Sequence, residues 1–141
     1  NFGMALYKSN IPDTSSGRFL LDAGTRFTLF KVHTNAENNN HVAIDIEGGL
    51  FSQFDMGNSL DSVGWDGRYG VFAVHDWSDT IAWRAGYRHL SAHLGDEYIE
   101  TTGRERVGYT RDMLAFGATV NAHKYWTFYV EPTWDLSMGS D

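Results

Sequence analysis

The chain has no cysteine among its 141 residues, so neither a disulfide nor a thiolate metal site can form. It has only two prolines against fifteen glycines, a balance that suits strands which bend and pack closely rather than a disordered linker. No apolar run approaches the roughly 20 residues that a transmembrane helix needs. Helical periodicity is nearly absent as well. These absences leave β-structure as the main expectation.

The charge is the next constraint on function. The net charge is −7, and no basic stripe is present that could neutralise phosphates, which argues against a nucleic-acid partner. Hydrophobic residues make up 42% of the chain and aromatic residues 15%, as expected for an all-β core or a membrane interface. The acidic balance does not argue against a membrane, because charged side chains can point into a wet lumen.

Period-2 alternation recurs along the chain and predicts strands. The clearest case is His41–Asp55, where Val42, Ile44 and Ile46 share one face while Asp45 and Glu47 share the other. The other predicted strands are Phe2–Lys8, Phe19–His33, Trp65–Asp76, Thr80–His89, Tyr109–Ala122 and Trp126–Leu136. Seven strands in a row with no helix between them predict an all-β, antiparallel up-and-down meander.

The connections and strand lengths favour a membrane barrel. Short links (Asn35–Asn40, Ser78-Asp79, His123-Lys124) alternate with longer ones (Ser9–Arg18, Gly57–Gly64, His93–Gly108), as outer-membrane barrels alternate periplasmic turns with outer loops. Trp77, Trp83 and Trp126 lie near the short turns, where an aromatic girdle would sit. Several strands exceed the usual five or six residues or so, and a tilted span needs about 9–11.

We therefore expect residues 1–141 to form a single segment of about seven strands of a transmembrane, outer-membrane-type β-barrel. The chain begins at Asn1 without an initiator Met or signal peptide and ends just past a strand, at Asp141. The expectation is a piece of a larger barrel, truncated at both ends, whose signal peptide was removed. It would lie in the outer membrane of a Gram-negative bacterium, against lipid bilayer and lipopolysaccharide. No protein partner is indicated.

The charged residues of the polar strand faces are predicted to line the lumen: Asp45, Glu47, Arg84, Arg88, Arg111, Glu131 and Asp135. Acidic side chains in this position could line a cation-preferring passage. The plainer interpretation is that they pair with Arg26, Arg68, Arg84 and Arg88 and close the lumen. A soluble β-barrel binding an apolar ligand is the alternative, and it requires the Val42-Ile44-Ile46 face to point inward.

The densest polar cluster, from Arg88 to Tyr98, ends one strand and opens the longest loop. The candidate catalytic residues are Ser91, His93, Asp96 and Glu97, suited to acid–base or nucleophilic work. His93, Asp96 and Glu97 could also hold a metal such as calcium or zinc, although no cofactor is required. His89 and Ser91 share a strand face with His93. The structural alternative is a hydrogen-bonded plug that binds Arg104, Arg106 or Arg111.

The stretch Ser91-Ala92-His93-Leu94-Gly95-Asp96-Glu97-Tyr98, followed by Arg106-Val107-Gly108-Tyr109-Thr110-Arg111-Asp112, resembles the signature of an uncharacterised bacterial family. That family consists of predicted outer-membrane barrels of a few hundred residues, with Ser-Ser-His-Leu-Gly-Asp-Glu near Tyr-Ser-Arg-Glu. The match covers one hairpin, and Ala92, Thr110 and Asp112 depart from it. The resemblance implies a longer parent barrel and no established activity.

A more distant similarity is to outer-membrane lipid A deacylases, whose His and Ser or Asp residues work at the outer leaflet. The placement of His93 at the predicted outer rim is similar to theirs. The sequence thus predicts a structural or passage-forming barrel, with an outer-leaflet lipid or lipopolysaccharide hydrolase around His93 as the alternative. Whether the protein is an enzyme stays open at this point.

Overall fold

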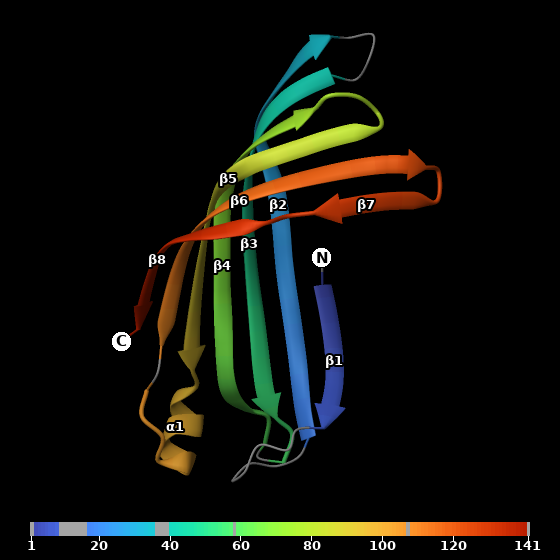
Figure 1. Ribbon diagram of the computed structural model, residues 1–141. Coiled ribbons are helices and arrows are strands. Elements are labelled where there is room, and N and C mark those ends of the chain that lie inside the picture. Colours follow the sequence, from blue (N-terminus) through green and yellow to red (C-terminus); the bar gives the residue numbers. More distant parts are fainter. Residues whose placement is uncertain (1, 9–16, 36–39, 58, 107, 141) are drawn as a thin grey trace.

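The computed structural model describes residues 2–8, 17–35, 40–57, 59–106 and 108–140 and contains eight strands and one short helix in these ranges (Figure 1). The elements are β1 (Phe2–Lys8), β2 (Gly17–Asn35), β3 (Asn40–Asp55), β4 (Asp61–Asp76), β5 (Ile81–Leu94), α1 (Asp96–Thr102), β6 (Tyr109–His123), β7 (Trp126–Val130) and β8 (Thr133–Ser140). The all-β prediction is confirmed. The predicted link Ser9–Arg18 falls largely outside the described residues.

All strands belong to one antiparallel sheet with the order β1-β2-β3-β4-β5-β6-β7, and β8 also pairs with β6. Strands β1 to β7 thus each lie beside their neighbours in the sequence, which confirms the up-and-down meander, while β8 continues along β6. Within the described residues the sheet is open, because β1 pairs only with β2 while β7 and β8 pair only with β6. The turns at residues 77–80 and 124–125 lie at one end of the sheet, and α1 lies at the other (Figure 1).

The predicted strand Trp126–Leu136 was wrong in one respect, because it is divided into β7 and β8 at Glu131-Pro132. Proline has no backbone N–H and cannot donate to a strand ladder. The carbonyl of Pro132 still accepts a hydrogen bond of 3.1 Å from the Phe116 amide, so both pieces follow β6. The sheet consequently has eight strands rather than seven.

The absence of helix was also predicted wrongly, because α1 lies inside the predicted loop His93–Gly108. Gly95 precedes the helix, and its amide donates to the carbonyl of Val63 at 3.0 Å. Gly103 ends the helix with a φ of 64°, a left-handed conformation that glycine adopts without strain. Tyr98 is buried and anchors α1. No helix in the described part of the chain is long and apolar enough to cross a membrane.

The two faces of the sheet carry different side chains. One face, here called the outer face, exposes large apolar residues, including Phe27, Val42, Leu50, Val71, Leu114 and Phe116. The opposite, inner face carries buried residues, including Ala43, Asp45, Phe72, Arg88, Met113 and Ala115. Successive residues of a strand point to opposite faces, so every central strand contributes to both sets. The predicted separation of apolar from charged residues is observed, and the apolar set is the exposed one.

One irregularity keeps this separation intact along β2. The pairing with β3 shifts between Thr28 and Phe30, which leaves Leu29 as an extra residue. A β-bulge of this kind changes which residues point to a given face. Phe27 pairs with Ile46 before the shift and Phe30 pairs with Ile44 after it, so both aromatic side chains stay exposed on the outer face.

Candidate functional site

Four charged residues form a closed network on the inner face, here called the inner charge cluster: Glu47 on β3, Arg84 and Arg88 on β5, and Glu131 after β7. Arg84 lies 3.0 Å from Glu47 and 2.5 Å from Glu131, and Arg88 lies 2.8 and 2.7 Å from the same two carboxylates. The four side chains are only 10–14% exposed. Each arginine therefore bridges both glutamates in a poorly solvated position.

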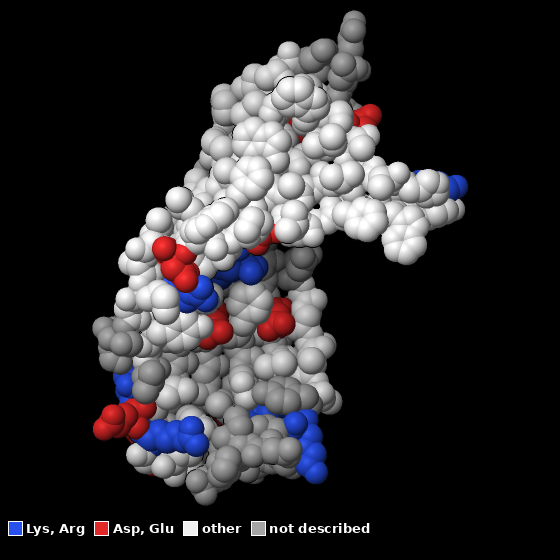
Figure 2. Space-filling view, in the orientation of Figure 1, with Lys and Arg blue, Asp and Glu red and all other residues white. Residues whose placement is uncertain are grey.

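The cluster requires the sheet to curl toward its inner face. β3 and β7 are four strands apart in the sheet order, which is about 19 Å in a flat sheet with a spacing of about 4.8 Å. Arg84 reaches carboxylates from both sides of this span. In Figure 2, acidic and basic side chains accordingly lie side by side in the hollowed middle of the surface.

A phenylalanine forms the base of the cluster. The ring of Phe72 is fully buried, and the guanidinium groups of Arg84 and Arg88 lie 4.3 and 5.3 Å from its centroid. Gly86 makes room for it, because a Cβ there would lie 2.7 Å from the Phe72 Cα and 2.1 Å from a backbone carbonyl. Cation–π contacts thus add to the ion pairs, and the arginine side chains cover the ring.

Two further pairs belong to the predicted lumen charges. Asp45 lies 3.4 Å from the Nε of Arg26 and is itself buried. Arg111 donates two hydrogen bonds of 2.7 and 3.1 Å to the Oδ1 of Asp135, and both side chains are about one-third exposed. The structure therefore brings every predicted lumen carboxylate to an arginine.

Arg68 differs from the other arginines of this face. It was predicted to pair with a carboxylate, but within the described residues it forms no ion pair, and its buried Nε has no hydrogen-bond partner. Its guanidinium lies 5.0 Å from the ring centroid of Phe51. The prediction for this residue was wrong, because pairing depends on which side chains meet across strands and not on the presence of charge alone.

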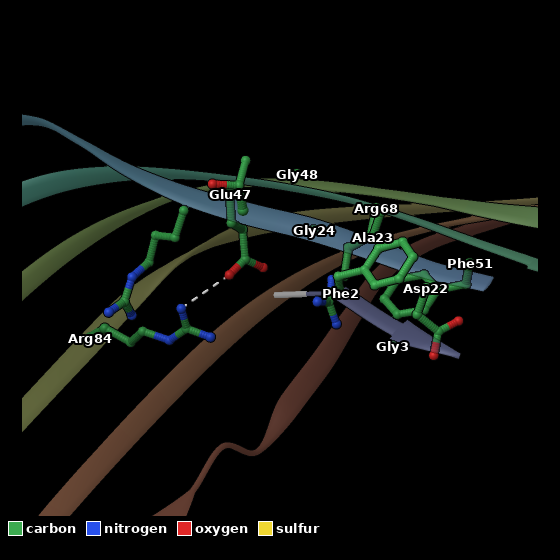
Figure 3. A pocket seen from close by; sticks show the side chains of 12 residues that line it. Phe2, Gly3, Asp22, Ala23, Gly24, Glu47, Gly48, Phe51, Arg68 and Arg84 are labelled. Atoms are coloured by element: carbon green, nitrogen blue, oxygen red, sulfur yellow. Dashed lines mark hydrogen bonds and ion pairs between the residues drawn. The ribbon is translucent and has the colours of Figure 1, made fainter. Parts of the chain in front are cut away.

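Beside the cluster the inner face is hollowed, with a volume of about 780 Å³. Figure 3 shows this hollow, which is lined by Asp22, Arg26, Glu47, Phe51, Arg68 and Arg84 among others. A volume of this size lies in the range of small-molecule sites, about 300–1,000 Å³. The hollow is thus the candidate binding site of the inner face.

The structure does not gather the predicted catalytic residues. Ser91 and His93 lie on β5, and the ring of His93 packs against Trp65 with 4.4 Å between centroids. Asp96 and Glu97 lie in the first turn of α1, both exposed, and Asp96 pairs with Arg106. The Asp96–Arg106 contact matches the structural alternative. In the described ranges no three His, Asp or Glu side chains gather as metal ligands, so calcium at His93, Asp96 and Glu97 stays a prediction.

Sequence reasoning missed a different polar cluster, which lies on the outer face around Asp112 of β6. The Nδ1 of His89 lies 2.7 Å from the Oδ1 of Asp112, and the Ser137 hydroxyl donates to its Oδ2 at 2.7 Å. The Tyr87 hydroxyl also donates to Asp112. The ring of Tyr69 stacks on His89 with 4.8 Å between centroids. An oriented histidine with a carboxylate partner is an arrangement used for acid–base work.

The signal for this cluster was present in the sequence only in part. His89 and Asp112 both stand in the hairpin that carries the family resemblance, and they are direct cross-strand partners. The link between β5 and β6 is long, however, and only a tight turn fixes strand register from sequence. Comparison of the chain with protein-family models, with curated proteins and with solved structures finds no match, so function has to be argued from this geometry.

Proposed function

We propose that this sheet is part of the wall of an outer-membrane-type β-barrel, with its outer face against lipid and its inner face lining a charged interior. The protein would then serve as a structural or passage-forming membrane barrel. The observation that supports the proposal is the inverted placement of side chains: large apolar residues are exposed on one face while the inner charge cluster is enclosed on the other. Water-soluble sheets place these two sets the other way round.

Two further features support a membrane setting. A contiguous exposed apolar face of this extent is rare in monomeric soluble proteins. The central strands β2 to β6 are each long enough for a tilted span, which takes about 9–11 residues. In hydrocarbon, every strand edge has to be paired. The proposal therefore requires further strands beside β1 and beside the β7–β8 edge.

Lipid contact can be measured through the native tryptophans. Trp83 and Trp134 lie on strands β5 and β8 with outward neighbours Phe116 and Leu114. Reconstitution into vesicles with brominated acyl chains should quench their fluorescence strongly, relative to vesicles without bromine. Unchanged fluorescence, together with a protein that stays dispersed in buffer without detergent, would support the soluble barrel and overturn the proposal.

A second candidate function, an outer-leaflet acyl-ester hydrolase, is favoured by the His89–Asp112 pair. An ionised residue on a lipid-facing surface is costly and usually functional. Asp112 would hold the Nδ1 proton of His89, which leaves Nε2 free as a base. Ser91 lies two residues from His89 on the same face of β5, and its hydroxyl borders Gly67 there. It would attack the ester carbonyl, pass its proton through His89 to the leaving alcohol, and water would release the acyl group.

This candidate differs from the sequence prediction in the histidine that it uses, which makes it testable. Vesicles of phosphatidylethanolamine with lipopolysaccharide serve as substrate, and released fatty acid is measured by mass spectrometry. His89→Ala and Asp112→Asn should lose nearly all release, while His93→Ala should keep it, because the His93 ring packs on Trp65 and makes no hydrogen bond to Asp112. If the unaltered protein releases no fatty acid either with or without calcium, the hydrolase is excluded.

A further inference from the structure

The hollow of the inner face contains a cation and an anion that the ion-pair network does not use. Arg84 and Glu47 are each engaged twice in the inner charge cluster. Arg68 and Asp22 line the same hollow, and within the described residues neither forms an ion pair or a side-chain hydrogen bond. The buried Nε of Arg68 has no hydrogen-bond partner, and leaving such a group unsatisfied costs about 1–3 kcal/mol.

The hollow owes its space to glycines. Gly24 and Gly49 occupy the two positions across the strands from Arg68, in the row Gly24–Gly49–Arg68. Neither contributes a side chain, and the ring of Phe51 leans toward Gly49, 3.3 Å from where a Cβ would stand. The Arg68 side chain therefore borders open space instead of a neighbouring carboxylate (Figure 3).

The chemistry of the free groups selects the ligand. A guanidinium presents a planar fork of N–H donors that matches an oxyanion, and the Phe51 ring below it holds that plane in place. Asp22 lies on β2, two strands from Arg68 on β4, and lines the same hollow. It is an acceptor for an ammonium or hydroxyl group. Together they fit a molecule with an anionic end and a donor end.

We propose that this hollow is a binding site for a small organic carboxylate that also carries an amine, with Arg68 binding the carboxylate and Asp22 accepting from the amine. The inference deepens the proposed charged interior and rests on it, because the solute must reach this face. The inner charge cluster forms the adjoining wall through Arg84 and Glu47, whose charges cancel. The site thus selects by the separation of two charges rather than by net charge.

The test uses calorimetric titration of the full chain in detergent micelles with three probes: glutamate, inorganic phosphate and glucose. Glutamate should bind saturably and more tightly than phosphate, and glucose should not bind. Arg68→Gln should weaken glutamate and phosphate at least tenfold, about 1.4 kcal/mol. Asp22→Asn should weaken glutamate several-fold and leave phosphate unchanged. Arg104→Gln, which alters an exposed loop arginine, should change neither.

Three results would overturn the site: glucose binding as well as glutamate, wild-type affinity in Arg68→Gln, or no saturable binding of either anion by the unaltered chain. If Arg68→Gln loses its sheet by circular dichroism, Arg68→Lys replaces it, and that variant should bind glutamate more weakly because it lacks the fork. Wild-type affinity in Arg68→Lys would count against the site. Lost anion binding with intact tryptophan quenching by brominated lipid would refute this site alone.

Discussion

On strand β4, Val71 is 49% exposed while its neighbour Phe72 is completely buried. A similar alternation of exposed and buried residues occurs in β3 and β6, so the same strands present an apolar surface outside and enclosed side chains inside. The outer face is held by the strand ladder, by ring contacts such as Tyr69–His89, and by the hydrogen bonds to Asp112. The inner face is held by ion pairs and cation–π contacts that together form a network from β3 to Glu131 after β7. The difference indicates that cohesion is concentrated on the inner face.

The largest expected effect comes from breaking the inner charge cluster. Glu47→Ala leaves Arg84 and Arg88 to share Glu131, and loss of one partner of a buried ion pair typically costs about 3–5 kcal/mol. Denaturant unfolding in detergent should show a loss of this size. Asp135→Ala is the control, because the Arg111–Asp135 pair, about one-third exposed, should be worth at most about 1 kcal/mol. Equal losses in the two variants would contradict the account, because they would mean that enclosure adds nothing to the strength of the inner charge cluster.

A charge placed on the outer face tests the same contrast from the other side. Val71→Lys should cost about 2–4 kcal/mol in phospholipid vesicles, because a cation near the middle of a barrel wall is driven into hydrocarbon. Thr119 of β6 points to the inner face, so Thr119→Lys should reduce the free energy of unfolding far less. The free energy of unfolding in vesicles measures both. A tolerated Val71→Lys would mean that the exposed apolar face meets water.

A smaller effect is expected at the end of α1. Gly103 has a φ of 64°, and alanine in this conformation costs about 1–2 kcal/mol, although nothing within 4 Å would clash with its Cβ. Gly103→Ala should speed hydrogen exchange of the amide that donates to Ile99 and leave the strands unchanged. The exposed Glu100→Ala in the same helix should leave this exchange unaltered. Faster exchange throughout the sheet would show that α1 is coupled to the core.

The smallest effect belongs to the Asp96–Arg106 pair, whose side chains are about 70% exposed. Arg106→Ala should change the free energy of unfolding by less than about 0.5 kcal/mol, because water competes for both charges. Chemical denaturation at low and high salt measures it. A loss of more than about 1 kcal/mol in the free energy of unfolding would mean that this pair acts as part of a structural plug.

The strands could be predicted from sequence because alternation is a local pattern. His41–Asp55 carries it over most of its length, and β3 begins one residue earlier. Proline at 132 carried the signal for the break that divides β7 from β8. The helix α1 escaped prediction because seven residues are too few for a 3.6-residue period, although Gly95, the acidic first turn and Gly103 are helix-boundary signals.

The sites could be predicted less well, because they depend on which side chains meet across strands. The sequence predicted that Glu47 and Glu131 would pair with arginines, but it did not predict that Arg68 would lack a carboxylate partner within the described residues. The His89–Asp112 pair needs the register of β5 on β6, which the long link conceals. The sequence therefore favours His93 as the catalytic histidine, whereas the geometry favours His89.

The most direct test of the inverted faces uses matched alanines, because the chain has no native cysteine. Ala73 is exposed on the outer face of β4, and Ala115 is 3% exposed on the inner face of β6. Each is replaced by cysteine, the protein is reconstituted in vesicles, and labelling by a membrane-restricted maleimide is compared with labelling by a water-soluble one. The account predicts that Ala73→Cys reacts only with the membrane-restricted reagent and that Ala115→Cys does not react with it. Labelling of Ala73→Cys by the water-soluble reagent would contradict it.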